Sequence, residues 1–264
     1  MEARKKHRKH GFQVVGPEHQ ADGSFDQGKV VEKKMIGFSG EGSLINQIGP
    51  LYYFAWAKAE KVASIPEHPH RGFEIISYVL EGELTHSDSL GKKTRLRTGD
   101  LQIMHTGSGM EHEEIFVSPP ISMLQIWLDP NFREEIKHAP HYQFASAQSF
   151  QDKVMVEGWF RRSLAGGEAM LELEAPVVME EWNMAANQSY HWHKPGYNLA
   201  ALVIKGSGEV ESSLAGELAT FQGGDFVVFE DELDSTISFH VQQKTRIIVF
   251  EILAELPYRL FPKP

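Results

Sequence analysis

Hydrophobic and polar positions along the chain form short runs that are separated by glycine and proline turns. Residues 73–80 (FEIISYVL) are rich in β-branched and aromatic side chains and are bounded by Gly72 and Gly82. Further runs follow in the sequence: LTHSD, KTRLR, LQIMH and ISMLQIWL. Short strands at spacings of about 8 to 12 residues, with turn signals between them, predict an all-β sandwich or barrel.

Helical periodicity is scarce, and the clearest example is residues 129–139 (DPNFREEIKHA). Asp129 is the expected N-cap, and Pro130 stands at the first helical position, where a missing N–H costs nothing. We therefore expect one short helix here, connecting two halves of the chain.

The second half of the chain repeats the pattern of the first. The segment YVLEGELTHS corresponds to LVIKGSGEVE in the second half, and RTGDLQIM corresponds to QGGDFVVF. The spacing between glycine landmarks is 17 positions from Gly82 to Gly99 and 18 positions from Gly206 to Gly224. Such a repeat predicts a tandem duplication of one small β-barrel, with residues 1–136 in the first barrel and 137–264 in the second.

Two pairs of polar residues in the first half have the spacing of a metal site. His68 and His70 lie in HPHRGFE, and His112 and Glu114 lie in GSGMEHEE. Residues i and i+2 of a strand point to the same face, so each pair can offer two ligands from one strand. Three nitrogens and one oxygen suit Fe(II), Mn(II), Ni(II), Co(II), Cu(II) or Zn(II) and leave positions open for substrate or dioxygen.

Other residues compete for a place at this site. Glu74 is the alternative carboxylate ligand, although Gly72 separates it from the histidine pair. His86 and His105 are interpreted as ordinary core residues, the alternative being that they support the ligands. A run of aromatic side chains either belongs to a buried strand, which we favour, or lines the pocket: Tyr52, Tyr53, Phe54 and Trp56.

The second half also contains a His-x-His, at His191 and His193. The positions that correspond to the second ligand pair are Ile237 and Phe239, which cannot coordinate a metal, and only His240 lies nearby. We therefore expect one metal per chain and a second barrel without metal.

Composition narrows the class of protein. The chain has no cysteine, which excludes disulfides and thiolate ligands, and its net charge of −10 disfavours direct binding of nucleic acid. A basic run at residues 4–9 is interpreted as a solvated terminus. The sequence shows neither a secretory signal nor an apolar stretch of membrane-spanning length, so the expectation is a cytoplasmic protein.

Together, HPHRGFE, YVLEGELTHSDSLG, TGDLQIM and GSGMEHEE resemble the pirin family of bicupins. The resemblance implies two tandem cupin-type barrels, with one iron, as Fe(II), held in the first barrel by His68, His70, His112 and Glu114. The wider cupin superfamily often takes its carboxylate from the first motif, which here would be Glu74. Ile75, Ile103 and Thr106 depart from the usual pirin pattern, so the resemblance predicts the substrate less firmly than the metal.

The resemblance implies an oxidoreductase similar to quercetin 2,3-dioxygenase, which opens a flavonol with O2 and releases carbon monoxide. Glu114 would then act both as a ligand and as the base that accepts the proton of the flavonol hydroxyl. The alternative is an iron-binding regulatory module that acts through a protein partner, as a transcriptional coregulator. A third interpretation is a cupin enzyme of another class, such as an isomerase.

Overall fold

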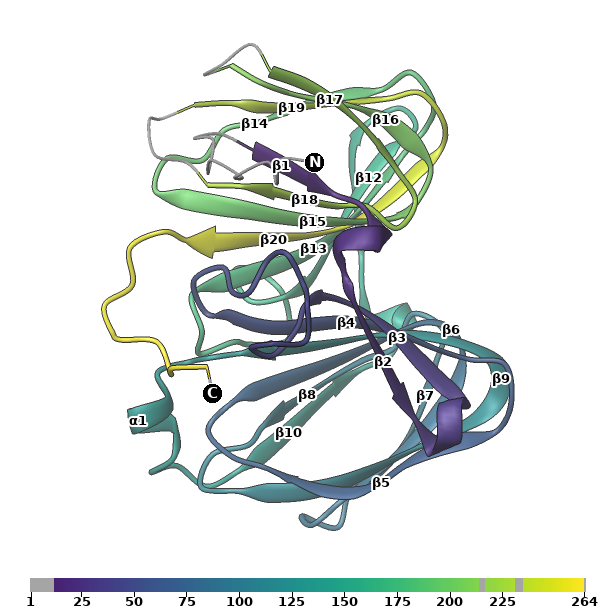
Figure 1. Ribbon diagram of the computed structural model, residues 1–264, viewed down its shortest axis with the longest axis vertical. Coiled ribbons are helices and arrows are strands. Elements are labelled where there is room, and N and C mark those ends of the chain that lie inside the picture. The colour runs from purple at the N-terminus through teal and green to yellow at the C-terminus, as the bar shows by residue number, and fades with distance from the viewer. Residues whose placement is uncertain (1–11, 214–216, 231–234, 264) are drawn as a thin grey trace, which may run out of the picture.

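The structure is a computed structural model that describes residues 12–213, 217–230 and 235–263. The described chain is almost entirely β-structure, which confirms the predicted fold class. Its strands form two halves that lie one above the other in Figure 1. The basic run at residues 4–9 lies outside the described residues. No described helix has the length and apolar character that crossing a bilayer requires.

The first half is built on one large antiparallel sheet. Its main path runs β10-β8-β6-β9-β4-β3-β2, with β5 pairing along β9 and β7 along β6. The strands are β2 (Ala21–Phe25), β3 (Val30–Ile36), β4 (Leu51–Ala59), β5 (Ala63–His70), β6 (Glu74–Asp88), β7 (Lys93–Arg97), β8 (Leu101–His105), β9 (Met110–Leu128) and β10 (His141–Ala145). Short 3-10 turns lie at η1 (Pro17–His19), η2 (Asp26–Gly28) and η3 (Ala147–Ser149).

The second half contains two sheets, whose orders are β1-β18-β15-β20-β13-β12-β11 and β14-β19-β16-β17. Their strands are β1 (Phe12–Val15), β11 (Asp152–Val156), β12 (Trp159–Ala165), β13 (Val177–Met184), β14 (Ser189–Trp192), β15 (Tyr197–Lys205), β16 (Ser207–Ser212), β17 (Glu217–Gln222), β18 (Phe226–Phe229), β19 (Ile237–Val241) and β20 (Thr245–Leu253).

Two strands cross the predicted division of the chain. The first strand, β1, pairs with β18 in the second half, with Phe12 opposite Phe229. Conversely, β10 follows the division but pairs with β8 in the first half, with His141 opposite His105. The division at residues 136 and 137 itself stays a prediction, and each half carries one strand from the other side of it.

The connecting helix is shorter than the sequence pattern predicted. Helix α1 covers only Phe132–Glu135, and its N-cap is Asn131, which has a φ of 85°. Asp129 is therefore not the N-cap. Its Oδ1 instead accepts the backbone N–H groups of Asn131 and Phe132, at 3.1 and 2.9 Å. Its Oδ2 accepts the N–H of Phe261, so this buried carboxylate also holds the C-terminal tail beside α1 (Figure 1).

Apolar and polar contacts join the two halves. The ring of Phe54 packs edge-on against Phe226 and Phe250, at centroid distances of 5.8 and 5.1 Å. Near them, the hydroxyl of Tyr78 donates to Glu181 at 2.6 Å, and the guanidinium of Arg246 donates to the same carboxylate at 2.7 Å. The interface between the halves therefore buries the carboxylate of Glu181, which accepts hydrogen bonds from both Tyr78 and Arg246.

This buried carboxylate predicts a dependence of stability on pH. Burial alone would raise the pKa of Glu181, but the hydrogen bonds from Arg246, Tyr78 and Asn183 lower it below its ordinary value. A depressed carboxyl pKa stabilises the fold above the unfolded value and ceases to do so as pH falls through the folded value. We expect the free energy of unfolding to fall below about pH 5 and to fall less steeply in Glu181→Gln, as measured by urea denaturation. Identical slopes in the two proteins would contradict this role.

Candidate metal centre

Three of the predicted ligands come together on neighbouring strands of the first half. Strand β5 runs antiparallel to the first part of β9, with His68 opposite His112 and His70 opposite Met110. Because His68 and His70 are separated by one residue of an extended strand, their side chains lie on the same face as that of His112. Among the described residues, His68, His70 and His112 form the one group of side chains with metal-ligand spacing.

The imidazole nitrogens of this group, the histidine triad, converge. The Nε2 atom of His112 lies 3.0 Å from Nε2 of His70 and 3.1 Å from Nε2 of His68. The ring centroids are similarly spaced for all pairs, at 4.5 to 4.9 Å. Two nitrogens that bind one ion at roughly 2.1 Å, at right angles to each other, are about 3.0 Å apart. The triad therefore has the spacing of adjacent ligands on a divalent metal.

A neighbouring carbonyl group determines which ring nitrogen of neutral His68 carries the proton. Its Nδ1 lies 2.8 Å from the carbonyl oxygen of Pro66, which can only accept a hydrogen bond. Nδ1 must therefore carry the proton, and Nε2 presents a lone pair to the triad. Burial, together with neighbouring imidazoles, lowers the pKa of His70 to about 3 and that of His112 to about 2. All of this donor chemistry fits a transition metal ion.

Glu114 lines a cavity that opens beside the triad, but it is not part of the triad. Its carboxylate is buried, and its Oε1 accepts the hydroxyl of Ser77 at 3.1 Å. Burial raises the pKa of Glu114 to about 7. Its carboxylate oxygens do not come within 4.8 Å of all the triad nitrogens. Its predicted role as a metal ligand stays a prediction, whereas its position suits exchange of a proton with a molecule in the cavity.

A cavity of about 580 Å³ opens beside the triad. Phe38, Tyr53 and Trp127 form an aromatic wall, in which Phe38 stacks on Tyr53 at 5.0 Å and Tyr53 lies 5.3 Å from Trp127. The edge of this wall reaches the triad, because the ring of Trp127 lies 4.8 Å from that of His70. Charged side chains also line the cavity: Glu32, Lys34, Glu41 and Glu67. The aromatic wall therefore offers a surface for a planar ring beside the candidate metal centre.

Of the aromatic run on β4, Tyr53 lines this cavity, whereas Phe54 belongs to the core between the halves. Tyr52 packs on Phe73 at 4.8 Å, and Nε1 of Trp56 donates to Ser122 at 2.6 Å. The preference for a buried strand was therefore right for most of the run.

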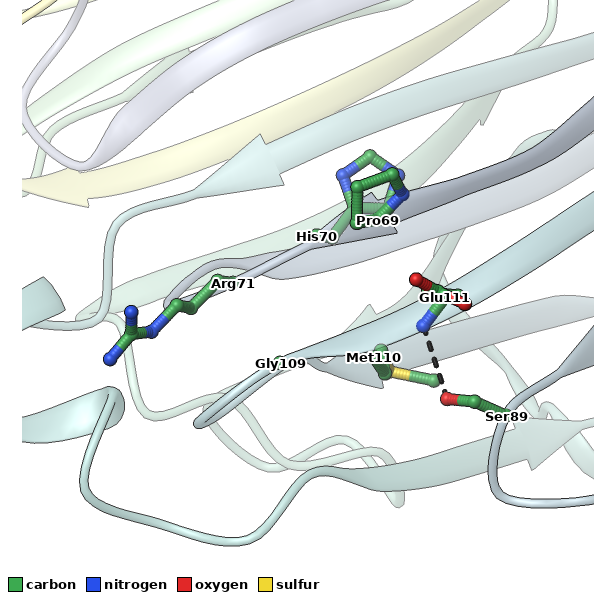
Figure 2. A pocket seen from close by; sticks show the side chains of 7 residues that line it. All are labelled: Pro69, His70, Arg71, Ser89, Gly109, Met110 and Glu111. Atoms are coloured by element: carbon green, nitrogen blue, oxygen red, sulfur yellow. Dashed lines mark hydrogen bonds between the residues drawn. The ribbon is translucent and has the colours of Figure 1, made fainter.

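Another groove, of about 510 Å³, lies at the end of β5 and also includes His70. Figure 2 shows Arg71 extending away from the start of β9, where the backbone N–H of Glu111 donates to the hydroxyl of Ser89 at 3.1 Å. His70 thus stands between this groove and the aromatic cavity.

Glu74, the alternative ligand, is engaged elsewhere. Its two carboxylate oxygens accept the backbone N–H groups of Glu174 and Ala175, at 2.7 and 3.0 Å. Nδ1 of His105 lies 3.1 Å from the same carboxylate, and the His105 ring stacks on that of His141 at 4.0 Å. Glu74 therefore joins the two halves of the chain and is not in the triad. His105 likewise belongs to this contact, in agreement with its interpretation as a structural residue.

His86 is not the ordinary core residue that the sequence suggested. It lies opposite Glu114 across β6 and β9, and its Nδ1 lies 3.4 Å from Nδ1 of His112. The sequence analysis also missed Asp88, whose Oδ2 lies 3.0 Å from Nε2 of His86. The His-x-Asp spacing of His86 and Asp88 on one strand was the available signal that the two side chains share a face. That spacing did not indicate a contact with His112, which lies 24 positions after Asp88 in the sequence.

The second half offers no equivalent triad among the described residues. His191 is exposed, and its Nδ1 lies 2.7 Å from the hydroxyl of Ser238. The interior of this half is filled by large apolar side chains, including the buried rings of Trp159, Trp182 and Trp192.

We expect a double variant, His191→Ala with His193→Ala, to keep the metal content of the unchanged protein. The reason is that the triad lies entirely in the first half. Metal analysis after exhaustive dialysis gives the answer. A fall from about two metals to about one per chain would show that the second half also binds metal.

Known proteins match the part of the chain that contains this candidate site. The pirin family model, described as "Pirin", matches residues 29–128, which include the whole triad. A pirin-like protein of Solanum lycopersicum is 27% identical over 207 residues, covering 72% of this chain and 70% of its own. Quercetin 2,3-dioxygenase of Escherichia coli strain K12 is 28% identical over 188 residues, covering 70% of this chain and 74% of its own.

A solved structure resembles the whole fold. The bacterial pirin YhhW of Escherichia coli, in complex with nickel(II), superposes with a TM-score of 0.75 at 20% identity, over 92% of this chain and 100% of that chain. Residues 29–128 are therefore similar to the pirin family, and the chain as a whole shares the fold of this bacterial pirin.

Proposed function

We propose that the protein is a metal-dependent dioxygenase that opens the ring of a flavonol with O2 and releases carbon monoxide. One observation carries the proposal: two members of the histidine triad, His68 and His70, line one cavity together with a buried carboxylate and an aromatic wall. In a balanced reaction, both ring bonds to carbon 3 of the flavonol break and this carbon leaves as carbon monoxide. Both atoms of dioxygen enter the ring-opened ester.

His68, His70 and His112 would hold the ion, for which we favour Fe(II). The relative in complex with nickel(II) supports a divalent transition metal at this fold. When bound, such an ion supplies a Lewis acid that favours ionisation of a flavonol hydroxyl and a centre at which dioxygen can react. The triad contributes neutral nitrogen donors on hydrogen-bonded strands, which would hold the ion beside the cavity.

The aromatic wall would orient the substrate. Phe38, Tyr53 and Trp127 present ring faces and edges to the cavity, and planar aromatic molecules pack well on such surfaces. The volume of the cavity, about 580 Å³, lies within the range of about 300 to 1,000 Å³ that is usual for small-molecule sites. The wall ends at His70, so a molecule that lies against it reaches the triad with one edge.

Glu114 would take the hydroxyl proton of the flavonol. It is buried in the cavity, and the hydroxyl of Ser77 fixes Oε1 at 3.1 Å. A carboxylate in this position can accept a proton without exposing the site to water. The remaining oxygen, Oε2, is the one available to face the substrate.

Oxygen uptake tests the proposal. Protein stripped of metal and reconstituted with Fe(II) should consume O2 when quercetin is added, and the stripped protein should not. A flavone that lacks only the 3-hydroxyl is the matched control, and we expect no uptake with it because it offers no proton to Glu114. Stoichiometric metal without any flavonol-dependent uptake would refute the enzyme and favour the metal-binding regulatory module.

A further inference from the structure

His86 and Asp88 form a buried chain of polar contacts behind the triad. Both lie on β6, whose register places Asp88 opposite His112 and His86 opposite Glu114 on β9. Oδ2 of Asp88 lies 3.0 Å from Nε2 of His86, and Nδ1 of His86 lies 3.4 Å from Nδ1 of His112. The side chains of His86 and Asp88 are both fully buried.

The direction of these hydrogen bonds follows from the surrounding groups. The hydroxyl of Tyr142 donates to Oε1 of Gln102 at 2.9 Å, which leaves the amide nitrogen of Gln102 to face Ser77 and Nδ1 of His86. This amide nitrogen can only donate, so Nδ1 of His86 must accept. The proton of His86 is then on Nε2, where it is donated to Asp88.

The acceptor at Nδ1 of His86 also faces Nδ1 of His112. A proton on Nδ1 of His112 is therefore favoured, and the lone pair of His112 lies on Nε2, the atom that faces His70 and His68. The ring of Tyr142 stacks on that of His86 at 5.1 Å with an interplanar angle of 18°, which holds the His86 ring in place.

We propose that His86 and Asp88 are positioning residues that hold His112 in the tautomer able to bind metal. The inference rests on the proposed metal centre and adds the residues that prepare it. Partners of this kind behind a ligand typically contribute 10- to 100-fold to metal affinity.

Asp88→Asn is the sharpest test because it should reverse the chain of hydrogen bonds. Oδ1 of Asp88 accepts the backbone N–H groups of Leu90 and Lys92, at 2.9 and 3.0 Å. If the asparagine oxygen keeps both of these hydrogen bonds, the asparagine NH₂ group takes the position of Oδ2 and faces Nε2 of His86. Nε2 of His86 would then have to accept, its proton would move to Nδ1, and Nδ1 of His112 would lose its partner acceptor.

The experiment measures Zn(II) affinity by chelator competition in the full chain. We expect Asp88→Asn and His86→Phe to bind Zn(II) about 10- to 100-fold more weakly than the unchanged protein. His86→Gln should recover part of the affinity, because its carbonyl oxygen can accept from His112. Phenylalanine keeps a ring against Tyr142 but lacks both nitrogens, so it separates packing from hydrogen bonding.

A nuclear magnetic resonance measurement reads the tautomer directly in metal-free protein. Long-range ¹H–¹⁵N correlation should place the His112 proton on Nδ1 in the unchanged chain and on Nε2 in Asp88→Asn. Unchanged affinity in folded Asp88→Asn and His86→Phe would overturn the proposal while leaving the triad intact, and an unchanged tautomer in Asp88→Asn would overturn it too. Absence of Zn(II) binding by the unchanged protein would instead refute the metal centre itself.

Discussion

Replacement of Glu114 with Gln is expected to reduce flavonol-dependent oxygen uptake by roughly 10²-fold or more, while most of the metal remains bound. Gln is nearly the same shape and can keep its hydrogen bond with Ser77, but an amide cannot accept the substrate proton. The triad, which consists of His68, His70 and His112, is untouched by this change. The rate of oxygen uptake should therefore fall while the metal content stays nearly unchanged.

Glu113→Gln provides the matched control, since Glu113 is the neighbour of Glu114 on β9 and points to the opposite face of the strand. We expect it to retain both uptake and metal. Parallel losses of metal and rate in Glu114→Gln would leave the role of a base without support and would favour a ligand role for this carboxylate.

Replacement of His112 with Ala is expected to reduce bound metal from about one per chain to below about 0.1, with loss of oxygen uptake. His112 is the central member of the triad, because its Nε2 lies within 3.1 Å of both other Nε2 atoms. The fold should survive, since the strands of the site are held by long hydrogen-bonded ladders between β5, β6 and β9. Metal analysis and circular dichroism of the same samples measure both results.

An exposed histidine serves as the control for this variant. The side chain of His138 lies outside the triad and is 67% exposed, so His138→Ala should keep its metal. Equal metal in the His112→Ala and unchanged proteins would show that the ion binds elsewhere.

The sequence placed His68, His70 and His112, together with Glu114, at one predicted metal site because β-structure has a period of two. His68 and His70 share the face of one strand by that rule, and His112 and Glu114 share the face of another. The all-β class followed from a different signal, the short apolar runs with turn residues between them, which fit few other folds.

Features that depend on contacts between distant segments could not be read from the pattern. Asp129 has the sequence context of an N-cap, but the C-terminal tail at Phe261 takes one of its oxygens. Glu74 lies near the first histidine pair in sequence, yet the backbone of residues 174 and 175 binds it. His86 acquired its contact with His112 only through the register of β6 against β9.

The central claim is that this metal centre opens flavonols, and the most direct test is a gas balance on Fe(II)-reconstituted protein with quercetin. Dioxygen consumed and carbon monoxide released should be equal in moles, and both should vanish in His112→Ala. Oxygen uptake without carbon monoxide, or no uptake by protein that holds one metal per chain, would contradict the claim.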